Sequence, residues 1–114
     1  PREKLELILD LRGKYMVYLL SNTNSIHWDY VCKNAFNYRG FRVNDYFEET
    51  FLSYEMHLAK PDKAIFEKVL QDANLLPEET LFIDDSEANC KAAEEVGIHA
   101  HHYHIGDDLS KVFE

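Results

Sequence analysis

An apolar run that leads directly into two adjacent aspartates constrains the fold of this chain more than any other feature. Residues 81–83 predict a buried strand that ends at Asp84 and Asp85, and residues 86–96 have the apolar spacing of a helix. A strand followed at once by a helix is typical of α/β proteins, whose ligands lie beyond the carboxyl ends of the strands. Two neighbouring carboxylates repel each other unless a cation lies between them, and their oxygens suit Mg²⁺. The alternative is that Asp85 or Ser86 only caps the helix, which would require one such residue and not an aspartate pair.

The alternation of strand and helix patterns continues along the chain. It predicts an α/β fold with a three-layer, Rossmann-like parallel sheet that carries helices on both faces. A single domain is expected, because no linker, repeat or low-complexity segment interrupts the pattern. Strands are expected at 15–20, 80–83 and 98–103, with a weaker candidate at 47–54, and a loop is expected at 41–46. Helices are expected at 2–12, at 25–37 with Ile26, Tyr30, Val31 and Phe36 on the buried face, from Pro61 onward, at 86–96 and after Asp108.

The charge of the chain limits its partners. The net charge is −9, from 21 acidic and 12 basic residues. Nucleic acid is therefore not an expected partner, since phosphate backbones are bound by clustered Lys and Arg. No apolar stretch approaches the roughly 20 residues that cross a bilayer, and no signal peptide is present, so no membrane partner is expected. Cys32 and Cys90 lack metal-ligand spacing, which is typical of a reducing compartment, and a cytoplasmic location is the expectation.

Complementary polar groups follow three of the expected elements. Ser21 and Asn22 come after the first strand, Lys60 lies at the start of a helix, and Asp84 and Asp85 end a later strand. A Ser hydroxyl beside helix-start amides binds anions, and a Lys ammonium supplies a point charge for a phosphate. Two carboxylates hold Mg²⁺, which can neutralise a phosphate. The order of these groups predicts a phosphate and Mg²⁺ site at one edge of the sheet.

These segments resemble the motifs of the haloacid dehalogenase-like (HAD) superfamily. The matching stretches are 17–23 (VYLLSNT), 60–66 (KPDKAIF) and 81–89 (LFIDDSEAN). The resemblance implies that Ser21 and the Asn22 amide hold a substrate phosphoryl group, and that Lys60 neutralises the nucleophile and the phosphate as a catalytic residue. It further implies that Asp85 is a catalytic Mg²⁺ ligand and that Asp84 supports it, directly or through water. Asn89 stands where many relatives carry another acid, and we expect it to orient its neighbours.

The first HAD motif, an Asp-x-Asp pair whose first aspartate attacks phosphorus, does not occur in this sequence. The resemblance therefore implies the C-terminal part of a core domain, in which a central strand between 15–20 and 80–83 is supplied by an N-terminal segment or a second chain. Residues 1–13 are expected to be the return helix from an upstream cap, and 14–114 to carry the other motifs. We expect that the chain alone is inactive and not a stable fold. The implied activity is Mg²⁺-dependent hydrolysis of a small phosphorylated metabolite through an aspartyl-phosphate.

Other interpretations stay open at this point. A HAD-like dehalogenase or epoxide hydrolase fits the same motifs, although dehalogenases of this kind do without Mg²⁺. A receiver-type phosphorylation switch has the acidic pair before its Lys-Pro, the reverse of the order found here. A non-catalytic scaffold built on the same fold is a further alternative, which the joint retention of Ser21, Lys60 and both aspartates disfavours. The histidines at 99, 101, 102 and 104 fall on opposite faces of a strand, which favours a solvated strand end over a metal site. His27 and Trp28 are minor candidates for contact with a substrate.

Overall fold

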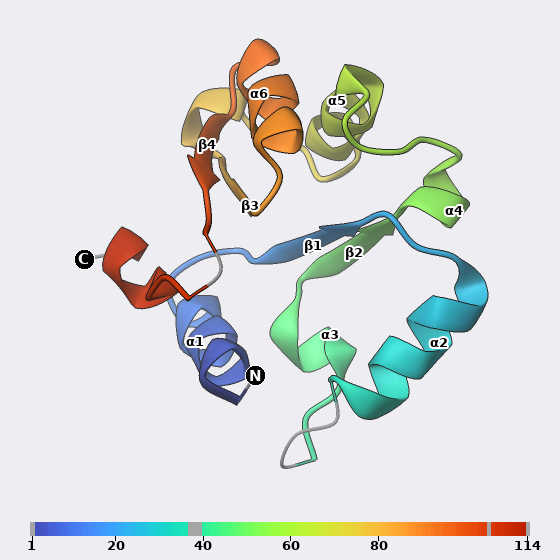
Figure 1. Cartoon of the computed structure of the whole chain (residues 1–114), viewed down its shortest axis with the longest axis vertical. Coiled ribbons are helices and arrows are strands. Elements are labelled where there is room, and N and C mark those ends of the chain that lie inside the picture. Colours follow the sequence, from blue (N-terminus) through green and yellow to red (C-terminus); the bar gives the residue numbers. More distant parts are fainter. Residues whose placement is uncertain (1, 37–39, 105, 114) are drawn as a thin grey trace. The chain divides into compact units, whose positions relative to one another are not determined.

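A computed structural model describes residues 2–36, 40–104 and 106–113 of the chain. The chain divides into two compact units, Pro1–His57 and Leu58–Glu114. Within the described residues, each unit contains one pair of parallel strands together with its own helices (Figure 1). The mixed α/β class with parallel strands is as the sequence predicts.

The first unit is built on the strands β1 (Tyr18–Ser21) and β2 (Glu49–Leu52), which run parallel in the register Tyr18↔Glu49 to Ser21↔Leu52. Among its described residues, this unit has four helices: α1 (Arg2–Arg12), α2 (Ser25–Asn34), α3 (Val43–Tyr46) and α4 (Ser53–Met56). Its buried residues come from the second half of the unit and are Tyr46, Phe47, Phe51 and Leu52.

Three expectations for the first strand and helix need correction. The strand begins at Tyr18 and not at residue 15, and Tyr15 and Met16 are exposed. The helix ends at Asn34; residue 37 of the expected range lies outside the described residues. Ile26 and Tyr30, expected on the buried face, are 83% and 64% exposed. Helical spacing identified a stripe of apolar residues here, but no described part of the unit packs over it.

The expected loop at 41–46 is instead partly helical. The carboxylate of Asp45 accepts a hydrogen bond from the Arg42 amide at 2.7 Å, and the Asp45 amide donates to the Arg42 carbonyl oxygen at 2.9 Å. These two bonds close the first turn of α3, which places Tyr46 in the core. The weak strand candidate at 47–54 is confirmed only for 49–52, because the chain turns into α4 at Ser53.

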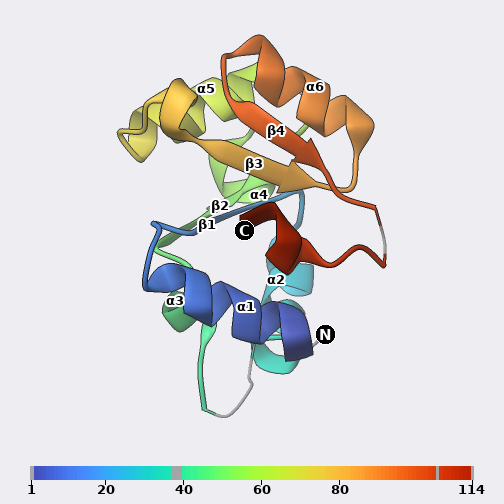
Figure 2. The same ribbon diagram turned by 90° about the vertical axis from the view of Figure 1, so that its left-hand side faces the viewer.

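The second unit has the strands β3 (Leu81–Asp84) and β4 (His99–His102), parallel in the register Leu81↔His99 to Asp84↔His102. The helices α5 (Lys63–Asp72) and α6 (Glu87–Glu95) lie on the same face of this strand pair (Figure 2). The described part of this unit also contains two short 3₁₀ helices, η1 (Pro77–Glu79) and η2 (Leu109–Phe113). The closing helix expected after Asp108 is thus a 3₁₀ helix.

The core of the second unit forms between the strand pair and its two helices. Ile65 and Phe66 of α5 are buried, and the Phe66 ring meets the Phe82 ring edge-on at a centroid distance of 5.0 Å. Cys90 of α6 is also buried, with its Sγ 3.7 Å from the carbonyl oxygens of Asp84 and His101. This packing fixes the carboxyl end of β3 against the start of α6.

The starts of both long helices in this unit are set by short polar side chains. Asp62 is the N-cap of α5, and its carboxylate accepts a hydrogen bond from the Ala64 amide at 3.0 Å. Pro61, expected in the first turn, precedes the cap and follows a cis peptide bond. Gly97 ends α6 with a φ of 91°, a conformation that glycine adopts without the steric cost of a Cβ.

No helix of the described residues is long and apolar enough to cross a membrane.

Candidate active site

The turn after β3 gathers charged and polar groups around Asp84. Lys60 Nζ lies 2.8 Å from Asp84 Oδ2, and the two side chains are only 11% and 10% exposed. The Ser86 amide donates to Asp84 Oδ1 at 2.8 Å, and Asn89 Nδ2 donates to Oδ2 at 3.2 Å. Asp84 therefore has three donors, one of which is a cation.

These contacts decide the charge state of Asp84. Burial alone would raise its pKa, but the hydrogen bonds from Lys60, Ser86 and Asn89 outweigh burial and hold the pKa below the ordinary value of 3.8. At neutral pH Asp84 is a carboxylate whose charge is balanced by Lys60. With Oδ2 accepting two bonds, the lone pairs still available for a metal ion are mainly on Oδ1.

Helix capping and charge are divided among neighbouring residues in this turn. Ser86 is the N-cap of α6, and its hydroxyl accepts a hydrogen bond from the Asn89 amide at 3.3 Å. The capping role, which the sequence left open between Asp85 and Ser86, thus belongs to Ser86. Neither aspartate is used to start the helix.

Asp85 differs sharply from Asp84. It is exposed, and its carboxylate has no hydrogen bond or ion pair within the described ranges 2–36, 40–104 and 106–113. Its main-chain carbonyl oxygen accepts a hydrogen bond from His102 Nε2 at 3.0 Å, which joins the turn to the last residue of β4. The turn therefore presents one neutralised carboxylate and, beside it, one carboxylate that can accept a ligand.

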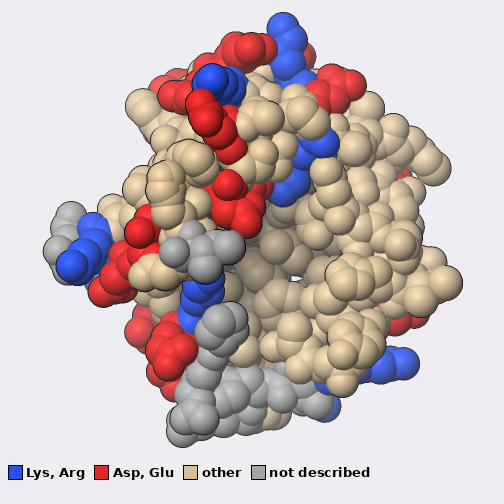
Figure 3. Space-filling model, viewed as in Figure 1, with Lys and Arg blue, Asp and Glu red and all other residues tan. Residues whose placement is uncertain are grey.

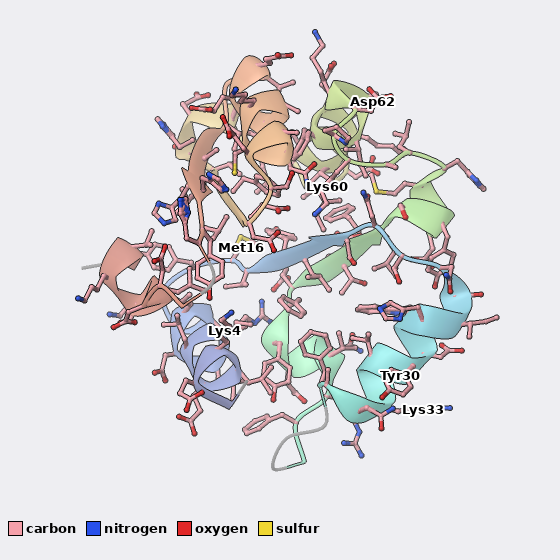
Figure 4. All side chains as sticks on the ribbon, viewed as in Figure 1. Lys4, Met16, Tyr30, Lys33, Lys60 and Asp62 are labelled. Carbon is pink, nitrogen blue, oxygen red and sulfur yellow. The ribbon has the colours of Figure 1, made fainter. Side chains whose placement is uncertain are left out.

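Lys60 reaches this turn from the segment that leads into α5 (Figure 4). Its ammonium also lies 5.7 Å from the centroid of the Phe82 ring, so the cation rests on an aromatic face as well as on Asp84. Over the helices α5 and α6 of the second unit, Figure 3 shows acidic and basic side chains interspersed with one another.

The other predicted site residues belong to the first unit. Ser21 is the last residue of β1, half-buried, rather than a residue after the strand, and Asn22 follows it exposed in the loop. Asn24 ends the loop as N-cap of α2, with its side chain accepting a hydrogen bond from the His27 amide at 2.8 Å. The structure joins Lys60 to Asp84 directly; a meeting of Ser21 and Asn22 with them stays a prediction.

Sequence reasoning missed two contributors to these loops. The sequence predicts Ser53 only as part of the weak strand candidate at 47–54, yet its hydroxyl bonds to the loop after β1. His102 is expected from the sequence to lie at a solvated strand end, yet its Nε2 bonds to the backbone of Asp85. No cluster of three or more His, Cys, Asp or Glu side chains with metal-binding geometry occurs in the part of the chain that the structure describes.

Comparison with known proteins identifies the family of this chain. The family described as haloacid dehalogenase-like hydrolase matches residues 2–97. The chain belongs to this family. Membership excludes the receiver-type alternative, in which the Lys-Pro and acidic segments have the opposite order.

Individual HAD relatives agree with the family match. D-ribitol-5-phosphate phosphatase of Bacteroides thetaiotaomicron is 42% identical over 94 residues, which are 82% of this chain and 46% of that protein. A HAD family enzyme of the same organism, solved with magnesium and inorganic phosphate as an aspartate-to-alanine variant, is 60% identical with a TM-score of 0.96, over 100% of this chain and 56% of that one.

A further HAD-like hydrolase structure, from Porphyromonas gingivalis, is 33% identical with a TM-score of 0.90 and covers 100% of this chain and 58% of that one. The chain thus spans about half the length of the HAD relatives that it matches.

Proposed function

We propose that the full-length protein is a Mg²⁺-dependent phosphatase that hydrolyses a small phosphate monoester. The observation that carries the proposal is the pairing of an exposed, unshared carboxylate, Asp85, with a neighbour, Asp84, whose charge Lys60 already balances. A divalent cation bound at Asp85 meets one net negative charge from this turn rather than two. The relatives named as a phosphatase, and solved with magnesium and phosphate, support the same activity.

The donor set of the turn fits Mg²⁺. This ion is typically held by one or two carboxylates together with waters and substrate phosphate oxygens, so a cluster of three acidic side chains is not required. Asp85 would be the ligand from this chain, and Oδ1 of Asp84 could accept a bond from a metal-bound water. When bound, Mg²⁺ would supply positive charge next to the phosphate.

Lys60 has two roles in this proposal. It keeps Asp84 ionised and in place, and its ammonium charge is proposed to stabilise a phosphate or an attacking carboxylate. Ser21 and the Asn22 amide are proposed to hold the phosphate oxygens. The nucleophilic aspartate, and the acid that protonates the leaving group, would come from a segment outside this chain, through an aspartyl-phosphate.

The substrate class follows from the named relative. D-ribitol 5-phosphate and related sugar or polyol phosphates are the first candidates, since this chain is 42% identical to the phosphatase named for that ester. We propose that α1 connects the core to a cap elsewhere in the full-length protein, so the residues that select the substrate lie mostly outside these 114 residues.

The experiment is a phosphate-release assay on full-length protein with a panel of phosphate esters, with Mg²⁺ or with EDTA. We expect release from D-ribitol 5-phosphate or another polyol phosphate that requires Mg²⁺ and returns when Mg²⁺ is restored. An Asp72→Asn variant is expected to release phosphate as the wild type does, since Asp72 is a surface residue at the far end of α5. Release that is equal in EDTA, or absent from every ester, refutes the proposal.

A further inference from the structure

Ser53 makes two hydrogen bonds to a single residue in the loop that follows β1. Its hydroxyl oxygen accepts from the Thr23 amide at 2.8 Å and donates to the Thr23 carbonyl oxygen at 3.0 Å. Thirty positions separate the two residues, and both are half-buried. One side chain therefore satisfies both main-chain polar groups of Thr23.

The position of Ser53 explains why a hydroxyl is used. The parallel ladder of β1 and β2 ends at the pair Ser21↔Leu52. The residue that follows β2 is Ser53, which is the first residue of α4. Because its backbone follows the helix, it cannot extend the ladder. A Ser hydroxyl, which both donates and accepts, supplies the missing pair of bonds one step beyond the end of the sheet.

The loop held in this way contains the proposed phosphate-binding residues. Thr23 lies two positions after Ser21, and Asn24 is fixed on the other side as the N-cap of α2. The Thr23 amide donates to Ser53, so this amide is used within the loop, and the donors proposed for the phosphate are the Ser21 hydroxyl and the Asn22 amide.

We propose that Ser53 is a positioning residue for phosphate binding: its paired hydrogen bonds to Thr23 hold the loop of residues 21–24 in the conformation that binds the phosphoryl group. The inference rests on the proposed phosphatase function, because it assumes that this loop receives a phosphate. Ser53 itself is not placed in contact with the substrate.

The test compares Ser53→Ala with Ser53→Thr in the full-length protein, using inorganic phosphate with Mg²⁺ as the probe in calorimetric titrations. Ser53→Ala is expected to weaken phosphate binding by about tenfold, since small displacements of binding groups have effects of this size or larger. Ser53→Thr keeps the hydroxyl and is expected to bind within about twofold of the wild type. Ser25→Ala, which removes an exposed hydroxyl at the start of α2, is the matched control and is expected to bind as the wild type does.

Amide hydrogen exchange supplies a second readout that does not depend on ligand. The Thr23 amide is expected to exchange at least about tenfold faster in Ser53→Ala than in the wild type, while amides of β1 and β2 keep their rates. If Ser53→Ala does not fold, Ser53→Cys, which keeps the side-chain volume with weaker hydrogen bonding, makes the same comparison.

The outcomes separate the inference from the function on which it rests. A wild-type protein that binds no phosphate overturns the proposed function and the inference with it. Phosphate binding that is equal in the wild type and a folded Ser53→Ala overturns the inference alone. A lower melting temperature of Ser53→Ala with unchanged phosphate affinity also overturns it, because Ser53 would then serve only the stability of the unit.

Discussion

Replacing Lys60 by Met tests the ion pair that organises the turn after β3. The substitution keeps most of the aliphatic stem and removes the ammonium, which leaves Asp84 ionised, 10% exposed and with two neutral donors. Breaking a fully buried pair costs about 3–5 kcal/mol. Because Ser86 and Asn89 continue to donate to Asp84, we expect a smaller loss in the free energy of unfolding, about 2 kcal/mol at pH 7.

The pH dependence gives this prediction its sign. A carboxylate whose folded pKa is lowered stabilises the fold above its unfolded pKa, and this stabilisation is lost as the pH falls through the folded pKa. The ordinary value for Asp84 is 3.8, and the folded value lies below it. The difference in stability between wild type and Lys60→Met should therefore be constant from about pH 6 to 8 and shrink below about pH 4, as Asp84 protonates.

Urea denaturation of the full-length protein, followed by circular dichroism, measures both effects. Lys68→Met is the matched control, because its ion pair with Asp72 is 3.4 Å long and the two side chains are 45% and 41% exposed. We expect that control to change stability by less than about 0.5 kcal/mol. Equal losses in the free energy of unfolding for Lys60→Met and Lys68→Met would refute the argument. So would a Lys60→Met loss that is just as large in an Asp84→Asn background as in the wild type.

Three further predictions concern the same turn and the chain as a whole. Asp85→Asn should lower kcat/KM by about a hundredfold or more, with little change in melting temperature, because an exposed electrostatic group is lost; an unaltered steady-state rate contradicts this role. Asn89→Asp places a carboxylate where an amide now donates to Asp84, so it should lower the melting temperature at pH 7, and lower it less at pH 4. A melting temperature equal to that of Asn89→Ala at both pH values argues against this charge repulsion. Residues 1–114 expressed alone should not give a cooperative, monomeric melt, since β1 and β3 each pair with one strand in the described residues; calorimetry with sedimentation decides this.

The sequence predicts the second unit better than the first, for a physical reason. Around β3 and α6 each local signal agrees with the next: an apolar strand, a Ser N-cap at 86, buried Ala92 and Ala93, and Gly97 at the helix end. Hydrophobic periodicity, capping and backbone preference then give the same boundaries.

In the first unit the local signals compete. Residues 15–17 are as apolar as a strand, but pairing with β2 begins only at Tyr18. The α3 turn depends on hydrogen bonds between Arg42 and Asp45 that composition does not reveal. The apolar stripe at Ile26 and Tyr30 predicts that these side chains are buried, but both are exposed. Helical spacing identifies such a stripe without showing whether another segment packs over it.

The candidate site could be predicted as residue types but not as contacts. The motif order points to Lys60 and the aspartate pair, and the structure assigns them different tasks: Asp84 pairs with Lys60, and Asp85 is left exposed. The hydrogen bonds of Ser53 and His102 join positions 30 and 17 residues apart, and such distant partners leave no trace in a single sequence.

The buried thiol of Cys90 can serve as a probe of local unfolding in the second unit. Burial, and then the nearby Asp84 charge, raise the pKa of this thiol, so little thiolate is present at neutral pH and none of it faces a reagent in the closed state. With Cys32 replaced by serine, the rate of alkylation at Cys90 would measure how often α6 lifts from β3 and β4. Slower alkylation upon addition of Mg²⁺ would mean that an ion bound near the start of α6 reduces local unfolding of this helix.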